Sequence, residues 1–337
     1  MRRGGERTFA PTVIATQDGR LQMGAYAARR LVWLPFLLII VTFVTFALLR
    51  VGPGDPVQVW LGQHQNDEVR ERLRAQLGLD DPLVVQYVRY IEGVVTRLDF
   101  GESFQFRGKS VGELLAKRIP VSLQLNLAAI IITLGVGIPV GLYAALRQGT
   151  GVDNVVVAIA LAFQSLPVFI TAPVLLLVFA LYLDILPTSG WDGFFSPKIV
   201  LPATVMGVPG IAIVVRLVRA SVLDVLGQDY IRTARAKGLS ETIVRWRHIL
   251  RNAMIPVVTS FGFTIAGLAG GTFIVEIYFG IPGVGFFTIN SLFARDYPVI
   301  MAFAIISTTL FMLANLVVDM MYPLLDPRIR LGAGNVT

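Results

Sequence analysis

The chain has 337 residues, of which 55% are hydrophobic and only 15% charged, and its formal net charge is +7. Because a soluble domain is typically about 25% charged, this composition favours a membrane protein over a soluble one. There are no cysteines, which excludes disulfides, thiolate metal sites and a cysteine nucleophile. The two histidines, His64 and His248, lie far apart in the sequence, so we predict no metal site.

Six apolar segments are long enough to cross a bilayer, which takes about 20 residues of helix. None carries a charge near its centre, as expected of a segment surrounded by lipid. The sequence therefore predicts an all-α integral membrane protein with about six transmembrane helices. The predicted spans are approximately Leu31–Leu49, Leu123–Leu146, Val155–Leu183, Ile199–Val218, Val257–Val275 and Val299–Leu324.

The third segment is too long for a straight span and contains Pro167 and Pro173. Proline removes a helical hydrogen bond and frees a carbonyl group, so we expect a kink or a partly unwound stretch there. Such a bend is compatible with a role in a pathway and equally with a bent helix that has none.

Lysine and arginine gather before the first span, between the fourth and fifth spans, and after the sixth. Since cytoplasmic loops carry an excess of these residues, we expect both termini and the loop between spans four and five to be cytoplasmic. This topology accounts for the positive balance without nucleic acid, which we do not expect as a partner. The first apolar run, about 19 residues, exceeds the usual 7–15 of a signal peptide, so we expect a retained helix.

The first loop, about Arg50–Ser122, is predicted to contain two helices on the extracytoplasmic side. Asn66 is placed to cap the first, and Gly78 to end it. Asp81 is placed to cap the second, with Pro82 at its first position. Such helices fit the membrane surface, a cover over the mouth of a pathway, or packing against neighbouring spans. The apolar faces are Val69, Leu73 and Leu77 on the first helix, and Val84, Val88, Ile91, Val95 and Leu98 on the second.

Gly108-Lys109-Ser110 ends like a phosphate-binding loop, but the required glycine five residues before Gly108 is absent, because position 103 is serine. No strand is predicted before it either. We therefore expect no nucleotide site here.

The loop between spans four and five carries a short basic helix, predicted from Asp229 to Lys237. Asp229 suits the positive N-terminal end of a helix and Lys237 its negative C-terminal end. Gly238 can adopt a left-handed backbone and stop the helix, and Ser240 can cap the next one. A narrow, basic helix projecting from the membrane could dock into a groove on another protein, or be a solvated loop held only by lipid phosphates.

The segment Tyr230-Ile-Arg-Thr-Ala-Arg-Ala-Lys-Gly-Leu239, followed by Arg247-His-Ile-Leu-Arg-Asn-Ala-Met-Ile-Pro256, closely resembles the cytoplasmic loop of ABC-importer permeases of the dipeptide, oligopeptide and nickel branch. The general family begins this loop with Glu-Ala-Ala, whereas this chain has Arg232, Thr233 and Ala234, so a salt bridge assigned to that Glu does not carry over. The resemblance runs from about Met23 to the C-terminus. Further motifs that fit are Ala28-Arg29-Arg30-Leu31, Pro53-Gly54-Asp55-Pro56, Leu77-Gly-Leu-Asp80, Asp99-Phe-Gly101, Pro282-Gly-Val-Gly285, Arg295-Asp-Tyr-Pro298 and Asp326-Pro-Arg-Ile-Arg330.

This resemblance implies a type I ABC importer permease fold in the cytoplasmic (inner) membrane, moving dipeptides or oligopeptides. It divides the chain into a cytoplasmic tail (1–30), a first transmembrane helix (31–50), an extracytoplasmic helical loop (51–122), a core permease domain of five spans (123–326) with its coupling loop at about 220–256, and a cytoplasmic tail (327–337). The implied partners are a second similar permease, two ATPases, an extracytoplasmic substrate-binding protein, the lipid bilayer and the peptide substrate. ATP and Mg²⁺ would be used by the ATPases, with no cofactor and no catalytic residue in this chain. The implied ATPase-coupling residues are Asp229, Tyr230, Arg232, Thr233, Ala234, Arg235, Ala236, Lys237 and Gly238.

Polar side chains in the spans are candidates for the translocation path, or for hydrogen bonds between helices, because polar groups are costly in lipid. The glycine pairs Gly137/Gly141 and Gly267/Gly271 have the spacing that lets helices approach closely, either for sliding or for static packing. Two other readings are a related importer for nickel, glutathione or another small solute, and an ion-coupled secondary transporter. The absence of acidic residues at mid-membrane disfavours the ion-coupled transporter, and nothing positive favours a purely structural membrane protein. The path candidates are Gln124, Asn126, Gln164, Ser165 and Asn315.

Overall fold

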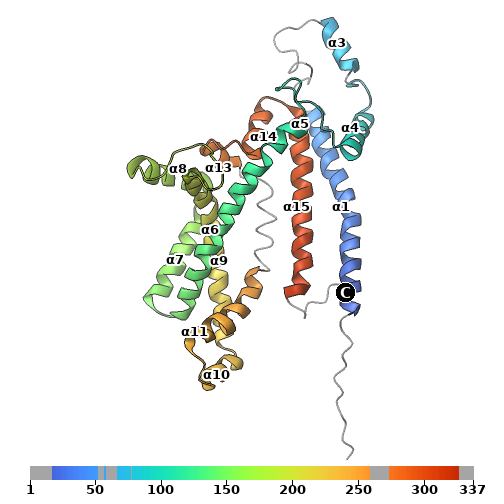
Figure 1. The fold of residues 1–337 in the computed structure, drawn as a ribbon. Coiled ribbons are helices and arrows are strands. Elements are labelled where there is room, and N and C mark those ends of the chain that lie inside the picture. The colour runs from blue at the N-terminus through green and yellow to red at the C-terminus, as the bar shows by residue number, and fades with distance from the viewer. Residues whose placement is uncertain (1–16, 52–56, 58–66, 77, 259–272, 326–337) are drawn as a thin grey trace, which may run out of the picture.

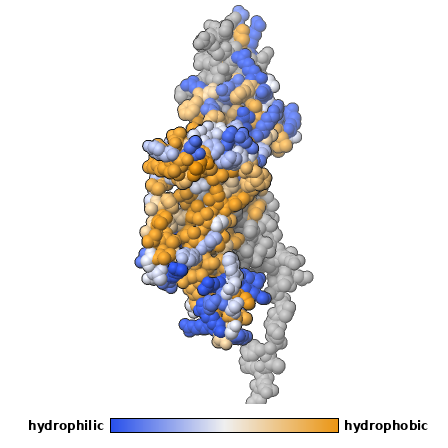
Figure 2. Space-filling view, turned by 60° about the vertical axis from the view of Figure 1, so that its left-hand side comes forward, coloured by the Kyte–Doolittle hydropathy of each residue, from blue (hydrophilic) through white to orange (hydrophobic). Residues whose placement is uncertain are grey.

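A computed structural model describes residues 17–51, 57, 67–76, 78–258 and 273–325 of the chain. Within them the protein is helical, and the one pairing of extended segments is an isolated bridge between Glu102 and Ser110. The helices form an elongated bundle (Figure 1). On the face that Figure 2 shows, the middle of the bundle is apolar and its two ends are hydrophilic. This distribution is that of a protein with a lipid-facing belt and two water-facing ends.

The centre of the bundle is the pair α6 (Ile119–Leu146) and α9 (Val200–Leu226). Gly137 and Gly141 bring the two helices together: a Cβ atom on Gly141 would lie 2.7 Å from the Val215 carbonyl oxygen, and one on Gly137 would lie 2.7 Å from Cγ1 of Val214. The close helix contact predicted from their spacing is therefore present. The second predicted glycine pair, Gly267/Gly271, lies outside the described residues.

The predicted third span is broken into α7 (Gly151–Ser165) and α8 (Val168–Leu176), with η1 (Leu177–Tyr182) continuing α8. The two parts are bent by 106°. Leu166 adopts an extended backbone, which is the conformation favoured before proline, here Pro167. The kink expected from the prolines is thus confirmed, at the first of them.

At the side of this core, α1 (Gln17–Val51) runs beside α15 (Tyr297–Leu325) (Figure 1). α1 begins well before Leu31, where the first apolar run starts. Three described helical segments are long and apolar enough to cross a membrane, and the bent α7–α8 pair makes a fourth. The apolar part of α1, Pro35–Arg50, is shorter than this limit over the residues searched. The predicted fifth span falls largely on residues 259–272, outside the described residues.

One end of the bundle, the α10 end, carries α10 (Asp229–Ala236), α11 (Glu241–Ile243) and the π-helical η3 (Val244–Leu250). The opposite end, the α4 end, carries the remaining short helices (Figure 1). These are α3 (Asp67–Gln76), α4 (Leu83–Arg97), α5 (Val111–Ala116), α13 (Phe273–Tyr278) and α14 (Val284–Phe293), while η2 (Pro197–Ile199) leads into α9.

Helix α4 differs in two ways from its prediction. Pro82 occupies the cap position, and Asp81 instead forms an ion pair with Arg89 at 2.8 Å. The buried side chains of α4 are Tyr87 and Val94, which lie beside the predicted apolar face and not within it. Most of that predicted face is more than half exposed: Val84, Val88, Val95 and Leu98.

Candidate functional site

Helix α10 is the candidate site for contact with an ATPase. Its first turn is stabilised by its own side chains. Asp229 opens the helix after Gln228, and the Thr233 hydroxyl donates to the Asp229 carbonyl oxygen at 3.0 Å. Arg232, which stands where the general family has Glu, lies 3.6 Å from the Asp229 carboxylate. Both side chains are strongly exposed, so this pair adds little stability and leaves both charges accessible.

The end of α10 is fixed by Gly238, whose φ is +76°. The Gly238 amide donates to the Arg235 carbonyl oxygen at 2.9 Å, and the Leu239 amide to the Ala234 carbonyl oxygen at 3.4 Å. This pair of bonds is the Schellman arrangement that a left-handed glycine makes possible. Glycine was predicted to stop the helix here, and it does so by this geometry.

Two side chains anchor α10 to the membrane-spanning core. Ile231 and Ala234 are buried, and they pack with Val218 and Val222 of α9 and with Val244 of η3. Burying an isoleucine fully contributes about 1.5–3 kcal/mol relative to leaving it exposed. Helix α10 is therefore packed directly against α9 and η3.

The remaining predicted coupling residues face outward. The Arg235 guanidinium pairs with Glu241 at 2.9 Å, which ties α10 to α11, and the Tyr230 hydroxyl accepts from the Asn252 amide at 3.1 Å. Ala234 is the one predicted coupling residue that faces inward. The exposed set is Asp229, Tyr230, Arg232, Thr233, Arg235, Ala236, Lys237 and Gly238.

Exposed apolar side chains beside α10 escaped the prediction. Trp246, in η3, is 64% exposed, and Ile243 and Leu239 are also exposed. The sequence signal that could have revealed them is a tryptophan between basic residues of the same helix. Ser240 precedes α11 as predicted, but its hydroxyl makes no cap hydrogen bond.

Among the described residues, no hydrogen bond joins any two of the five path candidates. The Ser165 hydroxyl and the Asn315 amide each donate to a carbonyl of their own helix, those of Leu161 and Phe311. Asn126, on α6, has a buried side-chain oxygen without a described partner. Gln124 is half-buried on α6, and Gln164 is exposed beside the α7–α8 break.

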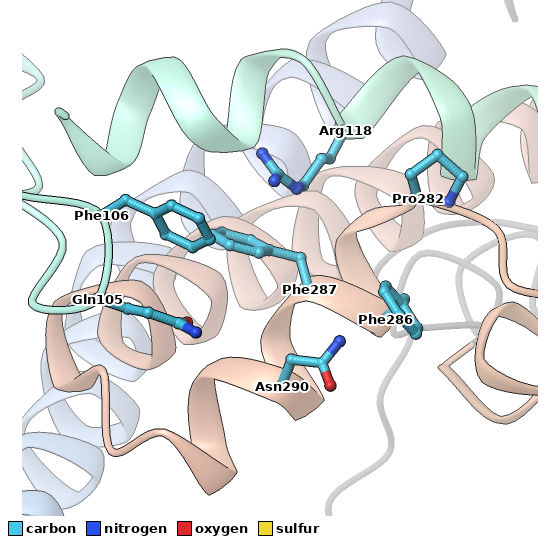
Figure 3. A pocket seen from close by; sticks show the side chains of 7 residues that line it. All are labelled: Gln105, Phe106, Arg118, Pro282, Phe286, Phe287 and Asn290. Carbon is cyan, nitrogen blue, oxygen red and sulfur yellow. The ribbon is translucent and has the colours of Figure 1, made fainter.

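A cavity of about 240 Å³ lies at the α4 end, between the loop before α5, the start of α6 and α14 (Figure 3). Its strongest feature is Arg118, whose guanidinium lies 3.9 Å above the ring centroid of Phe287 and donates to the Leu114 carbonyl oxygen at 2.6 Å. The cavity combines one cation with aromatic and amide side chains. It is lined by Gln105, Phe106, Arg118, Pro282, Phe286, Phe287 and Asn290.

Two fully buried carboxylates hold this end together. Asp296 accepts hydrogen bonds from the Ser103 hydroxyl and, at 3.0 Å, from the Phe104 amide. Glu276 accepts from the Ser122 hydroxyl at 2.6 Å. Both were missed as site residues, although Asp296 belongs to a motif quoted above. Among the described residues no group of three His, Asp or Glu side chains is arranged to hold a metal.

Comparison with known proteins covers nearly the whole chain. Residues 137–331 match the family described as binding-protein-dependent transport system inner membrane component, and residues 23–126 match the N-terminal part of such a component. The dipeptide transport system permease protein DppB of Bacillus subtilis is 39% identical over 92% of this chain and 99% of its own length. The oligopeptide transport system permease protein OppB of Haemophilus influenzae is 36% identical over 88% of this chain and 96% of its own. DppB of Escherichia coli is 38% identical over 86% and 94%.

Proposed function

The chain belongs to the family of binding-protein-dependent transport system inner membrane components, and on that premise we propose that it carries dipeptides or oligopeptides across the membrane. It is a multi-pass permease subunit of an ABC importer. The observation that carries the proposal is helix α10, because its buried side chains join it to the spans while its basic face is free to meet an ATPase. The peptide substrate is supported by the dipeptide and oligopeptide permeases that align with 92% and 88% of this chain.

The proposed orientation places the α10 end and both termini in the cytoplasm and the α4 end on the outer side. Its support is the cluster of arginines at and after α10, including Arg232, Arg245 and Arg251. In this arrangement two ATPases bind ATP and Mg²⁺ and dock on α10 of this chain and of a second, similar permease. A binding protein delivers the peptide at the α4 end, and this chain performs no catalysis itself.

In the proposed mechanism, closure of the ATPases moves α10. Ile231 and Ala234 pass this movement to α9, which holds α6 through the close contact at Gly141. The rigid group of α6, α9 and α10 then rocks against the second permease, opening the path to one side at a time.

The experiment is uptake into proteoliposomes that contain the assembled importer, with ATP inside and the binding protein outside. A radiolabelled dipeptide, an oligopeptide, glutathione and Ni²⁺ are compared, with and without ATP. We expect uptake of peptide only with ATP. If only glutathione or Ni²⁺ were taken up, the chain would still be an ABC importer subunit, but the peptide substrate would be wrong. Uptake that needs no ATP but stops with an ionophore would establish an ion-coupled transporter.

A further inference from the structure

Helix α4 carries an apolar stripe that stays exposed among the described residues of the chain. Val84, Val88 and Val95 are 59%, 56% and 73% exposed. At 100° per residue the three positions fall within about 40° of arc, so they form one continuous stripe along the helix. Thr96 and Arg89 are also exposed but lie about a third of a turn away, on the polar side.

The depth of α4 follows from its contact with α1. Tyr87 of α4 is buried against Phe43 and Phe46, with ring centroids 5.1 and 5.7 Å apart, and its hydroxyl lies 2.7 Å from that of Thr42. The apolar run of α1 ends at Leu49. With the end of this run taken as the edge of the hydrocarbon layer, Phe46 and Phe43 lie about 5 and 9 Å inside it, at about 1.5 Å per residue.

That depth and the composition of the stripe point to one occupant. Helices that lie in a membrane interface bury their apolar face about 5–10 Å into the boundary between headgroups and acyl chains. Protein interfaces are enriched in aromatic residues, methionine and arginine, whereas the exposed apolar side chains on this face, including Leu98 at its end, are all aliphatic. Figure 1 shows α4 beside the end of α1, on the side away from the α6–α9 pair.

We propose that α4 is an interfacial helix, embedded in the leaflet at the α4 end, with Val84, Val88 and Val95 in contact with acyl chains. Tyr87 fixes this helix to α1, so α1 and α4 form one unit whose depth is set by lipid on α4 as well as on α1. The proposal does not depend on which substrate the importer carries.

The test uses the absence of cysteine from this chain, which allows a single labelled position in it; the chain is labelled before it is assembled with its partners. Val88→Cys and Val95→Cys place a fluorophore on the stripe, and Thr96→Cys is the matched control next to Val95 on the polar side. The assembled importer is placed in nanodiscs of phosphatidylcholine with a nitroxide near the carbonyl end of the acyl chain. Only variants that retain uptake are compared. Two stripe positions are used so that the comparison still stands when one of the two variants loses uptake.

We expect the nitroxide to quench the labels at 88 and 95 at least about twofold more than the label at 96, with blue-shifted emission, because only the stripe reaches the acyl chains. Equal quenching at 95 and 96 would overturn the proposal. So would a stripe label that is not quenched and whose cysteine crosslinks to the second permease or to the binding protein, since the stripe would then be a protein interface.

Discussion

Arg219 on α9 donates two hydrogen bonds to Asp153 on α7, from Nε to Oδ1 at 2.6 Å and from Nη2 to Oδ2 at 2.8 Å. Only 3% of the Asp153 side chain is exposed, and the Gly149 amide donates to the same carboxylate at 3.1 Å. Bidentate ion pairs of this kind fix the relative orientation of the two side chains as well as pairing their charges. The start of α7 is therefore clamped to the helix that leads into α10.

Asp153→Asn should weaken this clamp, because an amide cannot accept both guanidinium bonds and leaves the arginine charge without its partner. We expect the thermal unfolding midpoint of the purified protein to fall by several degrees, measured by intrinsic tryptophan fluorescence. Glu113→Gln removes an exposed pair with Lys117 and should leave the midpoint almost unchanged. An equal effect of the two substitutions would show that the Asp153 pair has no special weight.

Gly238 should tolerate asparagine but not valine. A Cβ atom at this position meets nothing within 4 Å, so the cost of a side chain comes from the left-handed backbone and not from a clash. Asparagine adopts that backbone readily, whereas for valine it costs about 1–2 kcal/mol. We expect Gly238→Val to insert in the membrane but lose coupled uptake, and Gly238→Asn to keep most of it.

The measurement is ATP hydrolysis and peptide uptake in the same proteoliposomes. Full, coupled uptake by Gly238→Val would show that the end of α10 is not part of the coupling site. Loss of uptake in both variants would mean that exposed space at this position matters more than backbone conformation, as expected of a tight docking groove.

The sequence allowed several spanning helices, the break in the third span and the end of α10 to be predicted, because those signals are local. Leu166 and Pro167 break the third span as proline chemistry requires, and Gly238 ends α10 through neighbouring carbonyls. The glycine pair Gly137/Gly141 likewise marks a close helix contact, since small residues have that meaning in any membrane helix. Which helix lies opposite the pair was not predictable from the spacing.

Contacts between distant segments were not predictable from periodicity. Ser103 and Asp296 are far apart in the chain, as are Ser122 and Glu276, and no local pattern links either pair. For α4 the helical spacing of its apolar residues predicted one apolar face. Tyr87, at the edge of that face, packs on α1, whereas Val88 within it stays exposed. The burial of one part of an arc depends on where the neighbouring helix runs, which is a property of the whole fold.

Gly141→Ala should disturb the central helix pair. The added methyl group would lie 2.7 Å from the Val215 carbonyl oxygen and 2.9 Å from Cβ of Val218, and the backbone atom cannot move aside cheaply. Overpacking of this kind costs about 1–3 kcal/mol. Gly135→Ala is the matched control on the same helix, because nothing lies within 4 Å of its Cβ position, and it should be neutral or slightly stabilising. Equal unfolding midpoints for the two variants would contradict the close α6–α9 contact.

Asp296→Asn should loosen the loop before α5 without unfolding the bundle. The buried carboxylate accepts from the Ser103 hydroxyl, the Phe104 amide at 3.0 Å and the Gln105 amide at 3.3 Å. Asparagine has one acceptor oxygen, so at least one of these donors loses its partner, at about 1–3 kcal/mol. Because 1.4 kcal/mol corresponds to a tenfold change in an equilibrium, amide hydrogen exchange at Phe104 and Gln105 should rise about tenfold or more.

The control is Asp192→Asn, which removes an exposed pair with Lys198 at 2.7 Å elsewhere on the same end of the protein. It should leave exchange at Phe104 unchanged. If Asp296→Asn left it unchanged too, the loop would be held by its other contacts, chiefly Phe106 against Phe287. If instead exchange rose throughout α14 and α15, Asp296 would support the whole α4 end, and the cavity under Arg118 would owe its shape to this one carboxylate.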